Sequence, residues 1–216
     1  MRTAKTVLTV IQERGKQKKP IERVYKLLFN RELYLNAYAK LYPNNGAMTK
    51  GVTNETVDGM SIQKIDRMIE ILREEKYQWK PARREYIKKK NGKKRPLGIP
   101  VWGDKVLQEV MRQILEAYYE PQFSEHSHGF RPNRGCHTAL QEIQVWKGTR
   151  WFIEGDISQY FDTIDHKILL EILARNIHDG RFIRLVSNML EAGYLEEWKF
   201  KQTISGVPQG GVISPI

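Results

Sequence analysis

Two carboxylates six residues apart are the side chains of this chain best suited to chemistry. Asp156 closes an apolar, strand-like run that begins at Trp151, and Asp162 follows after the aromatic residues Tyr160 and Phe161. An aspartate at the end of a strand is a hard oxygen ligand on a rigid element, and it suits a Mg²⁺ ion that also binds substrate phosphates. A buried strand followed by a helix-capping aspartate would give the same pattern. The spacing alone leaves both interpretations open.

Basic residues are the second candidate for chemistry. The 216 residues contain 36 Lys and Arg against 25 Asp and Glu, a net charge of +11. Nine basic residues lie between Lys80 and Arg95, where Glu85 is the one acidic residue, and a smaller cluster spans residues 14–19. Clustered Lys and Arg neutralise phosphates, so this pattern favours a nucleic-acid partner over a solvated basic surface or a contact with acidic lipid.

Composition excludes several other classes of protein. A hydrophobic content of 40% is ordinary for a globular protein, and no apolar run is long enough for a membrane span or a signal peptide. The single cysteine, Cys136, excludes an internal disulfide framework and suits a reducing cytoplasm. His126, His128 and His137 do not have zinc-ligand spacing with it, and the chain has neither a Walker loop nor a nucleophile elbow. We therefore expect a cytoplasmic protein without a membrane partner. The sequence does not indicate an oligomeric state.

Helical periodicity dominates the first half of the chain. Apolar residues at spacings of three and four predict helices over residues 21–42 and 61–72, and a long helix over residues 104–118. Ser61 is in place to cap the second of these helices. Residues 1–20 lack this periodicity and are basic, so we expect a flexible or RNA-contacting arm.

A β-hairpin is expected where the basic residues are densest. Asn91-Gly92 separates two strand-like runs at 84–89 and 95–99, and Asn-Gly is the strongest short signal for a hairpin turn. The Asp156 strand follows later, with a strand pair around 198–204. Further helices are expected near residues 135–147, 165–176 and 181–192. Helices with few strands indicate the α+β class.

Four stretches, in this order, resemble a known family. They are the basic hairpin at 89–100, the loop at 127–134, the carboxylate stretch at 151–162 and the segment Ser205–Ile216, which contains Pro-Gln-Gly. Together they resemble the fingers and front palm of the reverse transcriptases encoded by bacterial group II introns. Residues 44–51 and the helix before them look like the amino-terminal extension of that family.

The resemblance implies a right-hand reverse-transcriptase fold of the α+β class. Its expected features are helix-rich fingers, a β-hairpin and an incomplete antiparallel palm sheet. The implied parts are a basic flexible arm over 1–20, a helical amino-terminal extension of the fingers over 21–80, fingers over 81–150 and a partial palm over 151–216.

The same resemblance implies roles for individual residues. Asp156 would be the catalytic carboxylate and, together with the backbone carbonyl of Ile157, a metal ligand. The residues that would bind the deoxynucleoside triphosphate are Lys89 and Arg95 at its phosphates, Phe161 beneath its sugar and Gln209 beside the new base pair. Those that would bind nucleic acid are Lys88, Lys90, Lys93, Lys94 and Arg131.

Several of these residues have a structural interpretation as well. Phe161 could be a core residue, Gln209 could serve the turn, and Arg131 could be a buried arginine that holds its loop. Asp162 could be a second metal ligand, although the family pattern makes it structural. His166 lies beside an expected helix start and needs no special role.

The resemblance implies an RNA-directed DNA polymerase that also acts as a maturase, a splicing cofactor that binds intron RNA, in the bacterial cytoplasm. Its cofactor would be Mg²⁺, with Mn²⁺ as a substitute. Its partners would be an RNA template or intron RNA, a DNA primer or target, and deoxynucleoside triphosphates. The alternative is a non-catalytic RNA-binding splicing cofactor.

One departure from the family pattern concerns activity. The family completes its metal site with a Tyr-Ala-Asp-Asp hairpin after the Pro-Gln-Gly segment, and these 216 residues contain no such sequence. Ser214-Pro215 has the form of a helix start and is followed by one residue. We therefore expect a chain truncated before that hairpin and inactive alone in DNA synthesis, because its second metal would lack protein ligands.

Overall fold

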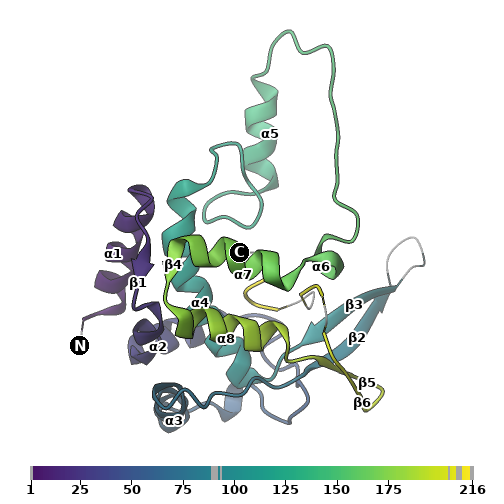
Figure 1. The fold of residues 1–216 in the computed structure, drawn as a ribbon. Helices are drawn as coiled ribbons and strands as arrows, with labels where there is room; N and C mark the ends of the chain where they lie inside the picture. The colour runs from purple at the N-terminus through teal and green to yellow at the C-terminus, as the bar shows by residue number, and fades with distance from the viewer. Residues whose placement is uncertain (1, 89–91, 93, 204, 208–210, 215–216) are drawn as a thin grey trace.

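The structure, a computed structural model, describes residues 2–88, 92, 94–203, 205–207 and 211–214. Helices surround one central helix, and a mixed β-sheet lies at one side of the body (Figure 1). This arrangement agrees with the expected α+β class. No helix in the described ranges is long and apolar enough to cross a membrane. The residues with expected roles that lie outside the described ranges are Lys89, Lys90, Lys93 and Gln209.

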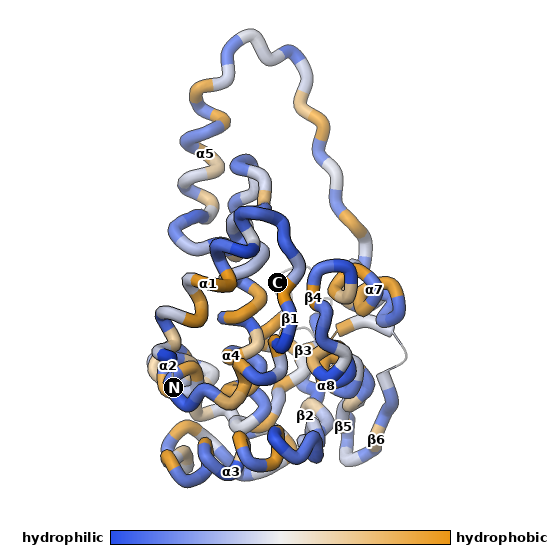
Figure 2. The backbone as a smooth tube through the Cα atoms, turned by 60° about the vertical axis from the view of Figure 1, so that its left-hand side comes forward, coloured by the Kyte–Doolittle hydropathy of each residue, from blue (hydrophilic) through white to orange (hydrophobic). Residues whose placement is uncertain are grey.

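Helix α4, Trp102–Tyr119, is the centre of the core. Its apolar stripe is fully buried, as the spacing predicted, with Val106, Val110 and Ile114 all at 0% exposure. Helices α1 and α2 pack against it, and Figure 2 shows it running through the body between them. Because neighbours cover several of its faces, even its charged residues Asp104 and Glu109 are buried.

The first 20 residues are not a flexible arm. Residues Ala4–Lys16 form helix α1, which Thr3 caps by accepting a hydrogen bond from the backbone of Thr6. This helix lies so close to α4 that a Cβ on Gly15 would sit 2.1 Å from the carbonyl oxygen of Tyr118. The sequence signal for this helix is weak because two of the four residues on its packed face, Ala4 and Gly15, are small and only Leu8 and Ile11 are large and apolar.

The predicted helix over 21–42 is divided into three pieces. Arg23 has a left-handed backbone (φ 55°) after strand β1. Asn30 caps a new helix, because its side chain accepts a hydrogen bond from the backbone N–H of Glu32. Asn30 has an extended backbone, so the helix before it ends there and α2 starts in a new direction. The apolar spacing of three and four residues continues, but it belongs to two separate helices. Ser61 caps the next helix as predicted. The elements are β1 Ile21–Glu22, η1 Val24–Phe29, α2 Arg31–Leu41, η2 Val57–Gly59 and α3 Ile62–Arg73.

A four-stranded mixed sheet contains the predicted hairpin. Strands β2, Ala82–Lys88, and β3, Lys94–Ile99, are antiparallel, and their register places Lys88 opposite Lys94. Strand β5 pairs with β2 in parallel and with β6 in antiparallel orientation, so the sheet order is β3-β2-β5-β6. The last two strands are β5 Tyr194–Glu196 and β6 Lys199–Lys201.

The helices of the second half follow the sequence prediction. Helices α7 and α8 pack together, and β4 between them pairs in parallel with β1, which joins the second half of the chain to the first. Asp165 caps α7 and Asp179 caps α8. The elements are η3 Glu120–Gln122, α5 Cys136–Gln144, α6 Tyr160–Thr163, α7 His166–Asn176, β4 Ile177–His178 and α8 Gly180–Leu190.

The expected strand that carries Asp156 is not formed. Residues 151–157 have no regular structure, and with α5 they make a projection that stands away from the body (Figure 1). Trp151 is 87% exposed and Ile153 is 93% exposed. A strand needs a neighbour that completes its hydrogen bonds, and none of the described sheets contains one for this segment. Of the expected antiparallel palm sheet, the described residues form one antiparallel strand pair, β5 and β6, which belongs to the mixed sheet.

Candidate active site

One cavity of about 770 Å³ brings together the residues to which the sequence assigned chemistry. The carboxylate stretch contributes Asp156, Ile157 and Phe161, and the hairpin contributes Lys94 and Arg95. The remaining lining residues are Pro96, Gly155, Gln159, Tyr160 and Asp162. Two segments about 60 residues apart in sequence therefore place cations and carboxylates around one space, as phosphate and metal binding require.

Asp156 reaches the cavity from an exposed segment rather than from a strand end. Ile157 beside it is 67% exposed, and the four-residue helix α6 starts three residues later. Gln159, which precedes α6, has a left-handed backbone (φ 54°), so the chain turns sharply between Asp156 and Phe161. This turn is what allows Asp156, Phe161 and Asp162 to line the same cavity.

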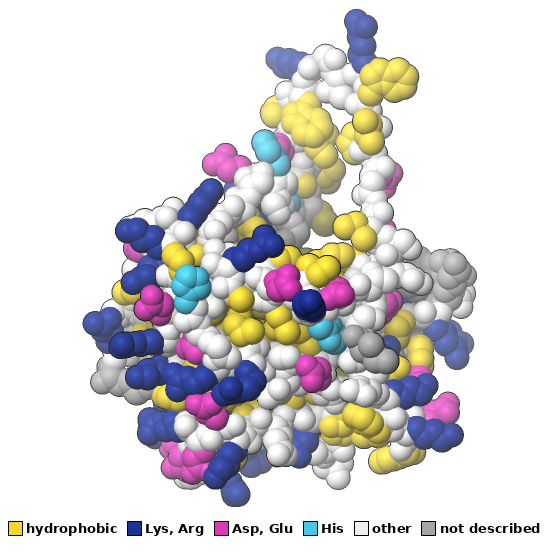
Figure 3. Space-filling model, in the orientation of Figure 1, with side chains coloured by type: hydrophobic (Ala, Val, Ile, Leu, Met, Phe, Trp, Pro, Cys, Tyr) yellow, Lys and Arg dark blue, Asp and Glu magenta, His cyan; other side chains and the backbone are white. Residues whose placement is uncertain are grey.

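The hairpin supplies the positive charge. Lys88 and Lys94 are paired across its two strands, and Arg95 faces Ile87 in the next pair. Like charges directly opposite one another destabilise a strand pair unless an anion lies between them. Figure 3 shows Lys and Arg side chains beside the hairpin, at the right of the view. The hairpin therefore concentrates positive charge beside the cavity.

Buried polar contacts fix the root of the hairpin. Asp104 on α4 is 2% exposed and accepts hydrogen bonds from the hydroxyl of Tyr77 at 2.7 Å and the backbone of Lys80 at 3.0 Å. Burial raises the pKa of the Asp104 carboxyl to about 6, although both hydrogen bonds act in the opposite direction. Lys80 lies two residues before β2, so Asp104 sets where the hairpin leaves the core.

A second contact joins the hairpin root to the loop before η2. Lys105 donates to the carbonyl oxygens of Gly46 at 3.1 Å and Thr49 at 2.9 Å. Arg83 on β2 donates twice to the carbonyl oxygen of Lys50, at 3.1 and 2.9 Å. Burial lowers the pKa of Lys105, with a smaller effect from nearby Arg83. Residues 46–50 are thus held against the strand that carries the basic residues.

Phe161 stands between two cavities. Its partly buried ring lines the polar cavity of Asp156 and also an apolar cavity of about 360 Å³ between α4, α7 and α8. Its backbone is held from the other side, because the N–H of Val207 donates to the Phe161 carbonyl oxygen at 2.7 Å. The segment that leads into Pro-Gln-Gly is therefore docked directly against α6.

The side chain of Arg131 is engaged within its own loop. Its side chain is 9% exposed and forms an ion pair with Glu120 at 2.9 Å. It also donates to the carbonyl oxygens of Ser124 at 2.6 Å and Ser127 at 2.9 Å, and stacks over the ring of Phe123. With its guanidinium engaged inside the chain, Arg131 holds the loop as the structural interpretation required. Its expected role as a template contact is not supported.

The histidines near Cys136 serve the same loop. His128 lies 2.7 Å from a carboxylate oxygen of Glu142 on α5, and His126 contacts the other oxygen. Within the described residues, no three His, Cys, Asp or Glu side chains are grouped as a metal site. These contacts anchor residues 124–134 to α5.

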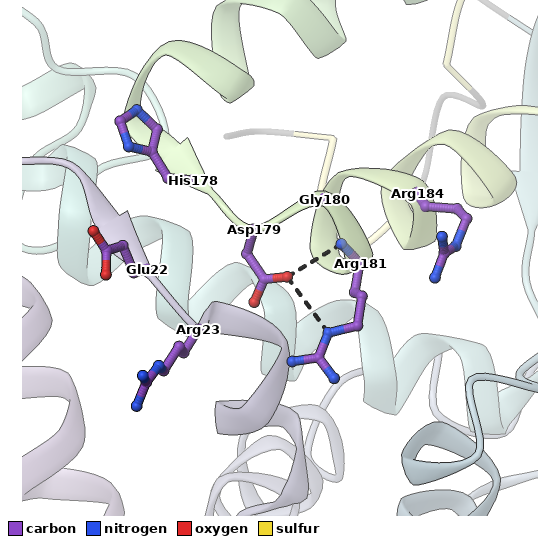
Figure 4. A pocket seen from close by; sticks show the side chains of 7 residues that line it. All are labelled: Glu22, Arg23, His178, Asp179, Gly180, Arg181 and Arg184. Atoms are coloured by element: carbon purple, nitrogen blue, oxygen red, sulfur yellow. Dashed lines mark hydrogen bonds and ion pairs between the residues drawn. The ribbon is translucent and has the colours of Figure 1, made fainter.

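A second charged cavity, of about 560 Å³, lies at the start of α8 (Figure 4). Asp179 accepts hydrogen bonds there from the backbones of Tyr25 at 2.9 Å and Arg181 at 3.1 Å. Glu75 from the end of α3 pairs with both Arg181 and Arg184. These contacts fasten α8 to η1 and to the residues that follow α3.

The donors present fit a hard divalent cation only in part. Asp156 and the Ile157 backbone offer oxygen atoms at the cavity, and Mg²⁺ typically takes one or two carboxylates together with substrate phosphates. Lys94 and Arg95 in the same cavity suit those phosphates. The site could thus share one cation between protein and substrate, and a second cation would need ligands other than these.

A basic hairpin and a carboxylate around one cavity are typical of proteins that bind nucleotides. Residues 87–216 match the family "Reverse transcriptase (RNA-dependent DNA polymerase)", which is more than half of the chain. The chain therefore belongs to the reverse transcriptase family.

Curated relatives narrow the family further. The chain is 50% identical over 196 residues to "Group II intron-encoded protein LtrA" of Lactococcus lactis subsp. cremoris, covering 90% of this chain and 33% of that protein. It is 47% identical over 221 residues to "Uncharacterized 91 kDa protein in cob intron" of Schizosaccharomyces pombe, covering 99% of this chain and 27% of that protein. "Nuclear intron maturase 1, mitochondrial" of Arabidopsis thaliana is 36% identical over 93 residues, or 43% of this chain and 13% of that protein. The resemblance to group II intron-encoded reverse transcriptases is confirmed, and the chain spans about a third or less of these relatives.

Proposed function

We propose that the cavity of Asp156 is the nucleotide-binding part of an RNA-directed DNA polymerase encoded by a group II intron. The whole protein would copy RNA into DNA and bind intron RNA as a maturase. The observation that carries this proposal is that Lys94 and Arg95 of the hairpin line one cavity with Asp156 and Ile157. Membership of the reverse transcriptase family supports the same reaction.

Each group in the cavity has a part in phosphoryl transfer. Arg95 binds the triphosphate through its planar guanidinium, and Lys89 adds a point charge. Asp156 and the Ile157 carbonyl hold a Mg²⁺ ion, for which Mn²⁺ can substitute. When bound, the metal neutralises charge on the reacting phosphate. Phe161 supports the sugar of the deoxynucleoside triphosphate and Gln209 contacts the new base pair. The lysines that follow the template or primer backbone are Lys88, Lys90, Lys93 and Lys94.

The fold supports a division of labour between parts of the chain. Residues 21–80 and 81–150 act as the amino-terminal extension and fingers, and residues 151–216 as part of the palm. The hairpin is held at its root by Asp104 and by the contacts of Lys105 and Arg83. A rigid root places the basic strands consistently over the Asp156 cavity, which is what phosphoryl transfer by positioning needs.

The test is DNA synthesis by a chimaera in which this chain replaces the matching third of the Lactococcus relative. The chimaera should extend a DNA primer on an RNA template with deoxynucleoside triphosphates and Mg²⁺. The matched control carries Arg95→Gln, which keeps the fold and removes the phosphate contact, and should raise the nucleotide KM. If substitutions of Arg95 and the other cavity residues left the rate of DNA synthesis and the nucleotide KM unchanged, the assignment of this cavity would be overturned.

A further inference from the structure

His166 makes a contact that neither the family pattern nor the expected site uses. It is the first residue of α7, and its Nε2 atom lies 2.7 Å from the carbonyl oxygen of Gly206. A carbonyl oxygen only accepts hydrogen bonds, so Nε2 carries a proton and donates it. The contact joins the helix after the Asp156 stretch to the segment before Pro-Gln-Gly.

The other described hydrogen bonds at this junction come from the segment itself. Gly206 N–H donates to the carbonyl oxygen of Ile164 at 2.8 Å, and Val207 N–H donates to that of Phe161 at 2.7 Å. The hydroxyl of Ser205 lies 3.4 Å from the carbonyl oxygen of Asp162. His166 instead donates to the segment, at the carbonyl oxygen of Gly206. Gly206 is therefore held through both its N–H and its carbonyl group.

The contact between His166 and Gly206 also affects the position of the Phe161 ring. Its carbonyl oxygen is fixed by Val207, and Val207 follows the residue that His166 holds. A shift of Gly206 would loosen the Phe161 backbone, and the ring lining the Asp156 cavity would move with it. A displacement of about 1 Å in a supporting group is enough to change a reaction rate strongly.

We propose that His166 is a positioning residue that fixes the segment before Pro-Gln-Gly against Phe161 and thereby sets discrimination between deoxyribose and ribose. The sugar-selection part rests on the proposed function. The positioning part does not, because it concerns contacts within the chain.

Hydrogen exchange on the 216-residue chain tests the positioning. His166→Ala should speed exchange of the Gly206 and Val207 amides about three- to tenfold, the range expected for one net hydrogen bond. His166→Gln should stay near wild type, because the glutamine amide nitrogen extends about as far as Nε2 of histidine. His166→Asn should behave like alanine, because its shorter amide reaches only the Nδ1 position. The control is exchange in α4, at Val110, which should not change in any variant.

DNA synthesis by the chimaera tests the sugar selection. His166→Ala and His166→Asn should lower the ratio of deoxynucleotide to ribonucleotide incorporation efficiency about three- to tenfold, and His166→Gln should restore it. Unchanged exchange at Gly206 in His166→Ala would overturn the positioning role. Faster exchange with an unchanged sugar ratio would overturn the link to selection. If the wild-type chimaera made no DNA, the proposed function would fail, and the exchange result would still decide the role of His166.

Discussion

Gly206 and Phe161 approach so closely that position 206 has no room for a side chain. A Cβ there would lie 2.6 Å from the carbonyl oxygen of Phe161, and the backbone of Gly206 has a left-handed φ of 80°. Glycine adopts that conformation without strain. The carboxylate stretch and the Pro-Gln-Gly segment, which the sequence presented as separate blocks, therefore meet at one junction beside the cavity.

Shortening Phe161 should change sugar choice. In the chimaera, Phe161→Ala should raise ribonucleotide use relative to deoxynucleotide use, because the substitution removes a steric wall from the cavity that Arg95 and Asp156 share. Deoxynucleotide incorporation should fall only modestly. The measurement is the ratio of incorporation efficiencies for the two sugars, taken beside a melting curve.

The apolar cavity behind Phe161 supplies the competing outcome. If the ring is mainly core packing, Phe161→Ala should cost about 3 to 5 kcal/mol of stability and depress incorporation of both sugars equally. Leu169→Ala is the matched control, because Leu169 lines the apolar cavity and not the polar one.

Neutralising the hairpin should weaken the salt dependence of RNA binding. Replacing Lys88 and Lys94 by glutamine should flatten the slope of log affinity against log salt by about 0.7 for each lost phosphate contact. Removing two like charges that face each other should leave the hairpin folded or stabilise it slightly. Affinity of the 216-residue chain for RNA, measured from low to moderate salt, gives the slope. Equivalent substitutions at Lys16 and Lys19 form the control, and a slope that responds only to them would move the RNA surface to α1.

Replacing Arg131 should cost stability and leave RNA affinity intact. Arg131→Leu leaves Glu120 without its ion-pair partner and removes one donor each from the carbonyl oxygens of Ser124 and Ser127. Breaking a buried pair in this way costs about 3 to 5 kcal/mol, and partial exposure of Glu120 places this case at the lower end. Urea unfolding and an RNA titration at a temperature where the variant is folded would separate the two effects. Weakened RNA binding by a fully folded variant would restore the template-contact role.

The stability contributed by Asp104 should fall as pH rises. Its folded-state pKa of about 6 lies above the ordinary value of 3.8, so ionisation of Asp104 opposes folding. The favourable contribution is complete below about pH 4 and is lost as pH rises through 6, a change of up to about 3 kcal/mol. The free energy of unfolding of the wild type relative to Asp104→Asn should therefore decrease between pH 4 and pH 7. A difference that is constant or increases with pH would show that the hydrogen bonds of Tyr77 and Lys80 outweigh burial.

The elements that sequence could predict are those whose signals are local. The stripe of α4, the hairpin around Asn91-Gly92 and the cap at Ser61 depend on neighbours in the chain, and the described parts of all three agree with the structure. Helix α1 was missed because half of its packed face consists of the small residues Ala4 and Gly15, which leaves only Leu8 and Ile11 as an apolar signal. The prediction of a strand at residues 151–156 was wrong. An apolar run forms a strand only where a neighbouring strand completes its hydrogen bonds, and the described sheets provide none for this segment.

Some residues of the candidate site could be anticipated from the sequence, and others could not. The family resemblance implied that Asp156, Phe161 and Arg95 belong together, and all three line one cavity. Residue type could not separate a phosphate-binding arginine from one that holds a loop, and in the structure Arg131 contacts Glu120 and its own loop. The role of His166 depends on a partner 40 residues away, and its only sequence signal was its place directly after the capping residue Asp165.

The most direct test compares the effect of Asp156→Asn on DNA synthesis with its effect on RNA binding. The substitution keeps the size of the side chain and removes the charge that would hold the metal, so DNA synthesis by the chimaera should fall at least about a thousandfold. RNA affinity and melting temperature should stay close to wild type, because Asp156 is exposed. Glu154→Gln, in the same exposed segment but outside the cavity, should alter none of the three. Retained synthesis by Asp156→Asn, or a loss of RNA binding as large as the loss of synthesis, would contradict the account.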